Sequence, residues 1–321
     1  MPNATVTVSE FVLHCAIDKD KMTFTIVALA LIYVVTLLGN LLVIVVIIIN
    51  PHLHSPMFFY IGTLAVFDMV NSSNLIPRML AVLLSNATTV PYGPCLLQLS
   101  VVYHLGVANG LLLSAMAYDR YVAVVYPLRY PSLVTKKTVC ISIFLVNIIS
   151  AAILTPYMVF ATELSFCRTN ILPYCFCDFV TMVHISCTED PRHLTLLSST
   201  TIATGVGELA IILFSYSRIV VAALKISSAD GKKKVFSTLL THLLVVCLFY
   251  LPLMISYILP GIGVQLSAEA YNVLVIIAIM VPPMMNPIIY SFRNKEIKGS
   301  IYRLWTRKRT TPDTFHGWSR M

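Results

Sequence analysis

The residues with the clearest chemical character are Asp119 and Arg120, two adjacent opposite charges at the end of a long apolar run. Between residues 96 and 117 the chain contains no Asp, Glu, Lys or Arg. Charged side chains are costly to remove from water at a membrane boundary and are kept there for pairing or switching. The pair therefore indicates a site kept for switching or pairing at the end of a membrane helix.

Asp68 and Glu208 are two further acids that lie within apolar stretches. An unpaired carboxylate in such a place either takes up a proton or finds polar partners. We expect Asn40 and Asn286 to be the partners of Asp68, because an amide can hydrogen-bond to either protonation state of a carboxyl group. This favours a structural polar cluster between helices, with a bound cation as the alternative. Glu208 receives no role, since burial alone can keep it neutral.

The composition requires a membrane environment for these residues. Of the 321 residues 58% are hydrophobic and only 11% are charged, whereas soluble domains carry about 25% charged residues. Seven apolar stretches each reach the roughly 20 residues needed to cross a hydrocarbon core of about 30 Å. They cover residues 24–49, 57–80, 96–118, 139–160, 194–224, 235–260 and 270–292.

These stretches predict an all-α membrane protein, a bundle of seven transmembrane helices over residues 24–292. Residues 1–23 would form an extracellular amino-terminal segment, and residues 293–321 a cytoplasmic tail. Within the tail, residues 293–305 can form a short amphipathic helix on the membrane surface. Residues 1–23 lack the basic start and apolar core of a signal peptide, so we expect the first transmembrane helix to act as the targeting signal.

The distribution of Lys and Arg gives the orientation. With the amino terminus outside, only Lys19, Lys21, Arg78, Arg168 and Arg192 of the 22 basic residues fall on the outer side. The positive-inside rule therefore predicts an extracellular amino terminus and a cytoplasmic Arg120. The net charge of +8 reflects mainly this asymmetry, so we expect no nucleic-acid partner. The basic segments 232–234 and 295–309 would lie against anionic membrane lipid.

The residues around Asp119 form part of a longer pattern. Residues 116–130 read MAYDRYVAVVYPLRY, which closely resembles the MAYDRYVAICxPLxY signature of odorant receptors, a branch of the rhodopsin-like G-protein-coupled receptors. Further strings resemble the family's motifs in the expected order along nearly the whole chain. They are LGN at 38–40, LHSPMFFY at 53–60, SY at 215–216, KVFSTLLTHL at 234–243 and PMMNPIIYSFRN at 283–294.

The resemblance implies how the charge pair would work. Arg120 would be held by Asp119 and by polar groups such as Thr238 or His242 on the helix expected at 235–260. Ligand binding would shift that helix outward, and Arg120 would then meet the carboxy-terminal helix of a G protein. The remaining switch residues that the motifs contribute are Tyr121, Tyr216, Asn286, Pro287 and Tyr290, of which Tyr216 and Tyr290 would fill the vacated space.

Two prolines and one substitution bear on this switch. Pro252 and Pro287 each remove a helical hydrogen bond and predict kinks at which helices can swing between two packings; static bending is the alternative. The family usually carries a second acid eleven residues before the Arg, where this chain has Asn109. Asn109 therefore joins the polar core without adding a negative charge for a cation.

Five cysteines fall on or near the predicted outer face, where an oxidising compartment allows disulfides but the sequence leaves their connectivity open. They are Cys95, Cys167, Cys175, Cys177 and Cys187. The resemblance implies the pairs Cys95–Cys177 and Cys167–Cys187, which leaves Cys175 over. Cys140 and Cys247 are expected to be small buried hydrophobes, Cys15 has no evident role, and no histidine pair accompanies the CxC at 175–177 to suggest a metal site.

Two asparagines on the predicted outer side match the N-glycosylation pattern, Asn3 and Asn86. Asn3 is the expected site, because odorant receptors usually carry a glycan there, whereas Asn86 lies close to the bilayer. Asn71 also matches but lies inside an expected helix, where the modifying enzyme cannot reach it.

Helical spacing places a ligand pocket between the outer halves of the helices expected at 96–118, 194–224, 235–260 and 270–292. The candidate lining residues are Tyr103, Gly106, Val107, Thr200, Thr204, Tyr250, Met254 and Tyr257. This lining is apolar and aromatic with a few hydroxyls, which suits a small organic molecule. Residues 249–252 read FYLP where mammalian odorant receptors usually read FYG, so an odorant class cannot be transferred to this chain.

The function that follows is that of an odorant receptor without a cofactor and without enzymatic activity. It would bind a small-molecule odorant and activate a stimulatory heterotrimeric G protein, raising cyclic AMP, in the plasma membrane of olfactory sensory neuron cilia. A related receptor for a non-odorant messenger is the nearest alternative. A transporter or channel is disfavoured, because no inverted repeat or ring of acids is evident. The HExxH, GxSxG and nucleotide-loop motifs of enzymes do not occur.

Overall fold

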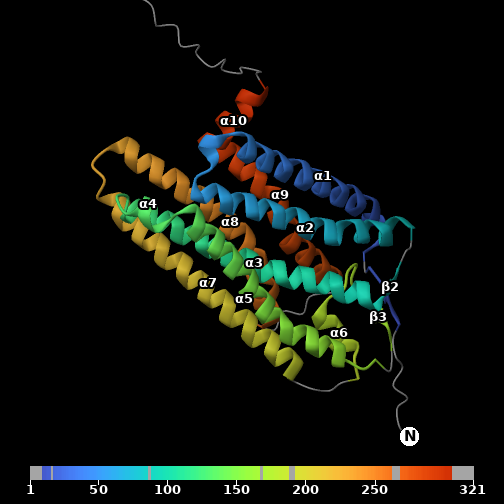
Figure 1. The fold of residues 1–321 in the computed structure, drawn as a ribbon. Helices are drawn as coiled ribbons and strands as arrows, with labels where there is room; N and C mark the ends of the chain where they lie inside the picture. Colours follow the sequence, from blue (N-terminus) through green and yellow to red (C-terminus); the bar gives the residue numbers. More distant parts are fainter. Residues whose placement is uncertain are drawn as a thin grey trace, which may run out of the picture.

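The structure is a computed structural model that describes residues 9–15, 17–85, 88–166, 169–187, 192–261 and 268–305. Within these ranges, seven long helices of at least 26 residues run side by side (Figure 1). They are α1 (Lys19–Ile49), α2 (Pro56–Ser85), α3 (Tyr92–Val125), α5 (Lys136–Glu163), α7 (Arg192–Leu224), α8 (Ala229–Gly261) and α9 (Ala268–Arg293). Each predicted apolar stretch lies within one of these helices, so the predicted all-α class is confirmed.

The outer surface of the bundle is suited to lipid. Among the described residues, α1, α3 and α5 and the greater part of α7, α8 and α9 are long and apolar enough to cross a membrane. Large apolar side chains such as Leu31, Phe144 and Phe214 are exposed on these helices, where lipid tails rather than water would cover them. The remaining long helix, α2, carries Asp68 and Asn71 and buries both of them inside the bundle.

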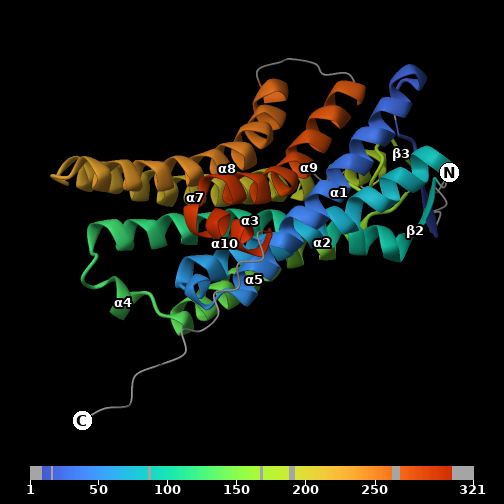
Figure 2. The same cartoon turned by 90° about the horizontal axis from the view of Figure 1, so that it is seen from above.

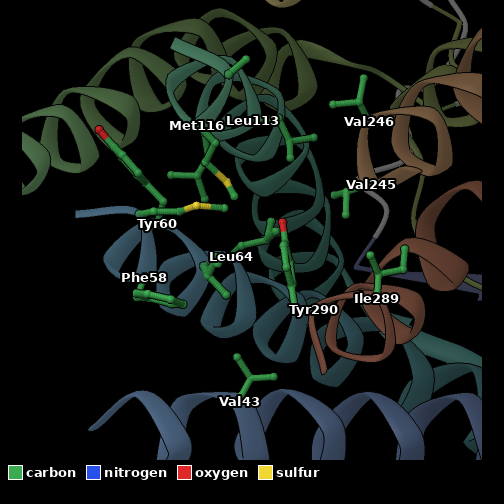
Figure 3. Packing of buried hydrophobic residues seen from close by; sticks show 14 of the residues in the cluster. Val43, Phe58, Tyr60, Leu64, Leu113, Met116, Val245, Val246, Ile289 and Tyr290 are labelled. Carbon is green, nitrogen blue, oxygen red and sulfur yellow. The ribbon is translucent and has the colours of Figure 1, made fainter. Parts of the chain in front are cut away.

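The helix α3 lies at the centre of the bundle and packs against α2, α5, α7 and α8 (Figure 2). Side chains from α1, α2, α3, α8 and α9 meet there in one apolar cluster (Figure 3). Tyr60, Met116 and Tyr290, each from a different helix, are almost fully buried in this cluster. The central position of α3 means that residues on its different faces contact most of the other helices.

At one end of the bundle a small sheet covers the helices. The strand β1 (Glu10–Leu13) lies between β2 (Thr89–Pro91), to which it is antiparallel, and β3 (Ile171–Leu172), to which it is parallel. Phe11 is completely buried below the sheet. The short helix α6 (Phe179–Ile185) is capped at its amino terminus by Asp178, whose side chain accepts a hydrogen bond from the Thr181 amide. We call this the sheet end of the bundle.

Disulfides join the sheet end together. Cys95 at the start of α3 is bonded to Cys177, the pair that the resemblance implies. A second bond joins Cys15 to Cys175, so the expectations that Cys175 is left over and that Cys15 has no role were wrong. Cys187 is also disulfide-bonded, while its expected partner Cys167 lies outside the described residues, as do Asn3 and Asn86. Cys140, expected to be buried, is exposed on α5, and Cys247 is half-buried.

The opposite end of the bundle carries η1 (Pro51–Leu53), α4 (Tyr130–Leu133) and α10 (Lys295–Trp305). The helix α10 lies in the tail where the amphipathic helix was predicted, and it leaves α9 at an angle (Figure 1). Ile297 and Ser300 are its completely buried residues. Arg303 donates a hydrogen bond to Ser300 within α10 at 2.8 Å and another to His52 of η1 at 3.0 Å, and the second attaches α10 to the segment that follows α1. We call this the α10 end.

Candidate functional site

Asp119 and Arg120 lie in the last two turns of α3 at the α10 end, and they pair directly. The Arg120 Nη2 and Nε atoms donate to the Asp119 Oδ2 atom at 2.6 and 3.0 Å. The Tyr130 hydroxyl in α4 donates to the other carboxylate oxygen, Oδ1, at 2.8 Å. The Asp119 side chain is only 2% exposed, whereas that of Arg120 is 21% exposed. Asp119 is thus held from both sides, while the guanidinium still reaches the surface.

Tyr130 is suited to this role as a donor. Burial of its hydroxyl and the neighbouring Asp119 carboxylate raise the pKa of Tyr130 well above its ordinary value. The hydroxyl therefore keeps its proton throughout the physiological range. A buried carboxylate requires such compensation, because an unpaired charge away from water is strongly destabilising.

The structure differs from the expectation that Thr238 or His242 holds Arg120. Within the described residues, the hydrogen bonds of Arg120 both go to Asp119. Thr238 instead donates to the Lys234 carbonyl in its own helix, as hydroxyl side chains in helices commonly do. The ring of His242 is hydrogen-bonded through Nδ1 to the Tyr216 hydroxyl and thereby joins α8 to α7.

Two further switch residues differ in their depth in the bundle. Tyr290 is 2% exposed and lies inside the bundle with the apolar cluster (Figure 3). Tyr121 is half-buried and packs against the same cluster from its edge. Its ring also contacts those of Tyr126 and of Phe214 in α7, with ring centroids 5.8 and 5.9 Å away.

The predicted polar core is only partly formed as expected. The Asn286 side chain donates to the Asp68 Oδ2 atom at 2.8 Å, and both residues are buried. Asn40 donates instead to the carbonyls of Thr36 and Pro283, at 2.9 and 3.0 Å. The Pro283 carbonyl is open to this bond because Pro287, four residues later in α9, has no N–H group to donate to it. Asn109 is buried, but within the described residues no hydrogen bond joins it to Asp68.

Pro287 brings α1 and α9 close together. A Cβ atom added at Gly39 would lie 2.9 Å from the Pro287 Cγ atom, so only glycine allows this approach. Beside this contact an apolar groove with a volume of about 450 Å³ opens between α1, α9 and α10. Lys298 and Tyr302 line its α10 side. None of the predicted ligand residues contributes to this groove, so it does not correspond to the predicted pocket.

The predicted ligand residues lie on α3, α7 and α8. Tyr103 stacks on Tyr157 at a centroid distance of 5.9 Å and donates to the Asp178 Oδ1 atom at 3.4 Å, so it supports the loop that leads into α6. Burial raises the pKa of the Asp178 carboxyl, and hydrogen bonds from Thr181 oppose this rise. Gly106 is exposed on α3, and a Cβ atom there would meet nothing within 4 Å.

The hydroxyls expected in the pocket are engaged in their own helix. Thr200 donates to the Leu196 carbonyl at 2.7 Å, and Thr204 donates to the Thr200 carbonyl at 2.8 Å. Val107 is half-buried on α3 and Met254 is exposed on α8. The side chain of Tyr257 lies outside the described part of the structure.

One contact in this region was not predicted. The Tyr250 hydroxyl donates to the Glu208 Oε2 atom at 2.7 Å and joins α8 to α7. The carboxyl group occupies the place that a side chain at Gly110 would need, since a Cβ atom there would lie 2.5 Å from the Glu208 Cδ atom. The only sequence signal for this contact was the presence of an acid, Glu208, in an apolar stretch. That signal did not indicate which residues of α3 and α8 would face the acid.

Comparison with known proteins agrees with this architecture. A family model described as "Olfactory receptor" matches residues 29–308. The chain is 33% identical over 314 residues to Olfactory receptor 1M1 of Mus musculus, covering 97% of this chain and 99% of that protein. It is 38% identical over 304 residues to Olfactory receptor 10N1 of Mus musculus, covering 92% of each. It is also 36% identical over 308 residues to Olfactory receptor 5p57 of Mus musculus, covering 94% of this chain and 97% of that protein.

The apolar helical bundle defines a multi-pass membrane protein with a charge pair at the end of its central helix. The match over nearly its whole length shows that the chain belongs to the olfactory receptor family. Members of this family are seven-transmembrane G-protein-coupled receptors and are not enzymes.

Proposed function

We propose that the protein is an odorant receptor that binds a small organic molecule inside the helix bundle. Ligand binding activates a stimulatory, olfactory-type heterotrimeric G protein and raises cyclic AMP. The observation that carries this proposal is the contact of Arg120 with Asp119 at the end of α3, closed from the other side by Tyr130. This arrangement keeps a cation partly accessible and ready for a new partner.

The resting contacts explain why activation requires helix movement. Arg120 is engaged by Asp119, and the Tyr216–His242 hydrogen bond joins α7 to α8 close to the same end. An outward shift of α8 breaks the Tyr216–His242 bond and opens space beside Arg120. Tyr216 and Tyr290 then move into this space, and the guanidinium turns from Asp119 to the carbonyl groups at the end of a G-protein helix.

The distribution of charge supports an orientation with the sheet end outside the cell. The described α10 end carries the basic residues Lys232–Lys234, of which Lys233 and Lys234 are exposed, and the basic helix α10; both suit a cytoplasmic, anionic lipid surface. The disulfides Cys95–Cys177 and Cys15–Cys175 lie at the other end, where an oxidising environment preserves them. As a member of the olfactory receptor family, the protein would reside in the plasma membrane of sensory cilia.

The ligand site would lie between α3, α7, α8 and α9 toward the sheet end. Gly106 leaves open space beside α3 there, and Tyr103 and Tyr157 form an aromatic wall with stacked rings. The walls contain few free hydrogen-bonding groups, because Thr200 and Thr204 donate to their own backbone. A mostly apolar volatile molecule with one polar group fits this chemistry.

The proposal is tested by expressing the receptor in cells and measuring cyclic AMP during exposure to a panel of odorants. We expect at least one odorant to raise cyclic AMP in a concentration-dependent way. The response should disappear in cells that lack the stimulatory G-protein α subunit and return when that subunit is restored. A response that persists without the subunit, or uptake of the compound without any signal, would overturn the proposal.

A further inference from the structure

Glu208 is a buried acid that the receptor mechanism described above does not use. The residue is 6% exposed on α7. Its Oε2 atom accepts the hydrogen bond from Tyr250, whereas its Oε1 atom has no hydrogen-bond partner within the described residues. The ion pairs among the described residues are formed by the acids Asp18, Asp119 and Glu269, and none of them provides a cation for Glu208.

The position of this carboxyl group relates it to the proposed pocket. Glu208 lies between Gly110 of α3 and Tyr250 of α8. Four residues from Gly110 toward the sheet end, a rise of about 6 Å, α3 carries Gly106. Four residues from Glu208 in the same direction, α7 carries Thr204.

At the same level α8 carries Met254, so helical spacing brings three predicted pocket residues to this level of the bundle. Gly106 leaves room there, because a Cβ atom added to it would meet nothing within 4 Å. Glu208 thus forms a polar floor beneath walls that are mainly apolar.

The chemistry of the floor selects a kind of ligand. A carboxylate enclosed by apolar helices is costly unless an opposite charge and further hydrogen bonds compensate it. Tyr250 supplies one hydrogen bond and no charge. A protonated amine supplies both the missing charge and a donor for Oε1, and its alkyl chain would extend outward past Gly106.

We infer that Glu208 is the specificity residue of the pocket and that it selects small aliphatic amines over uncharged molecules of the same shape. The inference rests on the proposed function, since it assigns a ligand class to the proposed pocket. Tyr250 acts as a positioning residue, because its hydroxyl fixes the carboxyl group through Oε2 and leaves Oε1 for the amine.

The test measures binding to the purified receptor in lipid nanodiscs by the shift of its thermal unfolding midpoint. Isoamylamine and isoamyl alcohol have the same carbon skeleton and are compared at equal concentrations and neutral pH. We expect the amine to raise the midpoint by several degrees and to bind at least tenfold more tightly than the alcohol. Equal shifts with both compounds, or no shift with the amine, would overturn the inference.

Two variants assign the effect to this carboxyl group. Glu208→Gln keeps the shape and should abolish the amine shift, whereas Glu269→Gln, a control on α9 at the sheet end, should retain it. An amine shift that survives in Glu208→Gln overturns the inference. If Glu208→Gln fails to fold, Glu208→Asp replaces it and should weaken amine binding at least threefold relative to wild type.

Cyclic AMP measurements separate this inference from the proposed function. Amine binding without any G-protein signal leaves the ligand assignment standing and contradicts the receptor proposal. Signals evoked by uncharged odorants, together with no amine binding, support the receptor proposal and overturn the assignment of Glu208.

Discussion

Replacement of Tyr130 by Phe removes one hydroxyl group from the contacts of Asp119 at the α10 end and changes little else. The hydroxyl donates to the Asp119 Oδ1 atom at 2.8 Å, and the Tyr130 ring can remain in place without it. Asp119 is 2% exposed, so the water that could replace the lost donor has little access. The variant therefore removes one of the hydrogen bonds that hold Asp119 and leaves Arg120 unchanged.

The size of the effect follows from the kind of hydrogen bond. A hydrogen bond to a charged group contributes about 1.5–3 kcal/mol. If the Tyr130 contact exists only in the resting receptor, its loss raises the ratio of signalling to resting receptors about ten- to hundredfold. We expect the lower end of this range, because Asp119 keeps its two hydrogen bonds from Arg120. A receptor with ~1% signalling molecules would then have ~10%.

The assay is basal cyclic AMP in the absence of odorant, divided by the amount of receptor on the cell surface. Tyr130→Phe should give a several-fold higher basal signal than the wild type. Tyr118→Phe is the matched control, because Tyr118 is 54% exposed on α3 next to Asp119 and its ring packs against that of Tyr121. Equal basal signals in wild type and Tyr130→Phe at equal surface levels would refute the reasoning.

Three further predictions follow from other parts of the structure. Gly110→Ala should lower surface expression and the unfolding midpoint, because its Cβ atom enters the space of the Glu208 side chain. Gly106→Ala should change neither quantity, because a Cβ atom there meets nothing within 4 Å. Equal behaviour of the two variants would contradict this. Cys15→Ser should reduce stability by about 2–4 kcal/mol, seen as a lower midpoint under non-reducing conditions, and an unchanged midpoint would count against the bond. Asp68→Asn should keep surface level and odorant response within about twofold, with or without sodium, if the polar cluster is structural; a sodium dependence that this variant abolishes would instead favour the cation.

The helices were predictable because the bilayer sets their length and composition. A span of about 20 apolar residues is a strong signal, and all seven predicted stretches lie within long helices. The helices extend beyond the apolar stretches, as α3 does from Tyr92 to Val125. Polar residues at the ends of α3 continue the helix without adding hydrophobicity, so hydropathy could not locate these ends.

The Cys15–Cys175 bond illustrates what the sequence did not reveal. These residues are 160 positions apart, and their approach depends on β1 lying between β2 and β3. Strands of two to four residues leave almost no pattern in a sequence. The covering of the sheet end is therefore a tertiary feature that local sequence signals do not contain.

The switch shows the same division between local and distant contacts. Asp119 and Arg120 are neighbours in the chain, so their pairing could be anticipated. The partner of His242 could not, because the rotation of α7 and α8 relative to α3 decides whether the ring faces Arg120 or Tyr216. Periodicity fixes which residues share a face of a helix, but it does not determine which helix that face meets.

The most direct test of the account is odorant-evoked cyclic AMP from the Arg120→Ala receptor, compared with wild type at equal surface levels. Arg129→Ala is the control, because Arg129 is exposed at the same end of the bundle and has no part in the pair with Asp119. We expect the maximal odorant-evoked cyclic AMP signal of Arg120→Ala to be at least tenfold lower than that of the wild type. The odorant should still shift the unfolding midpoint of the variant. Wild-type signalling by Arg120→Ala would contradict the claim that this arginine couples the bundle to the G protein.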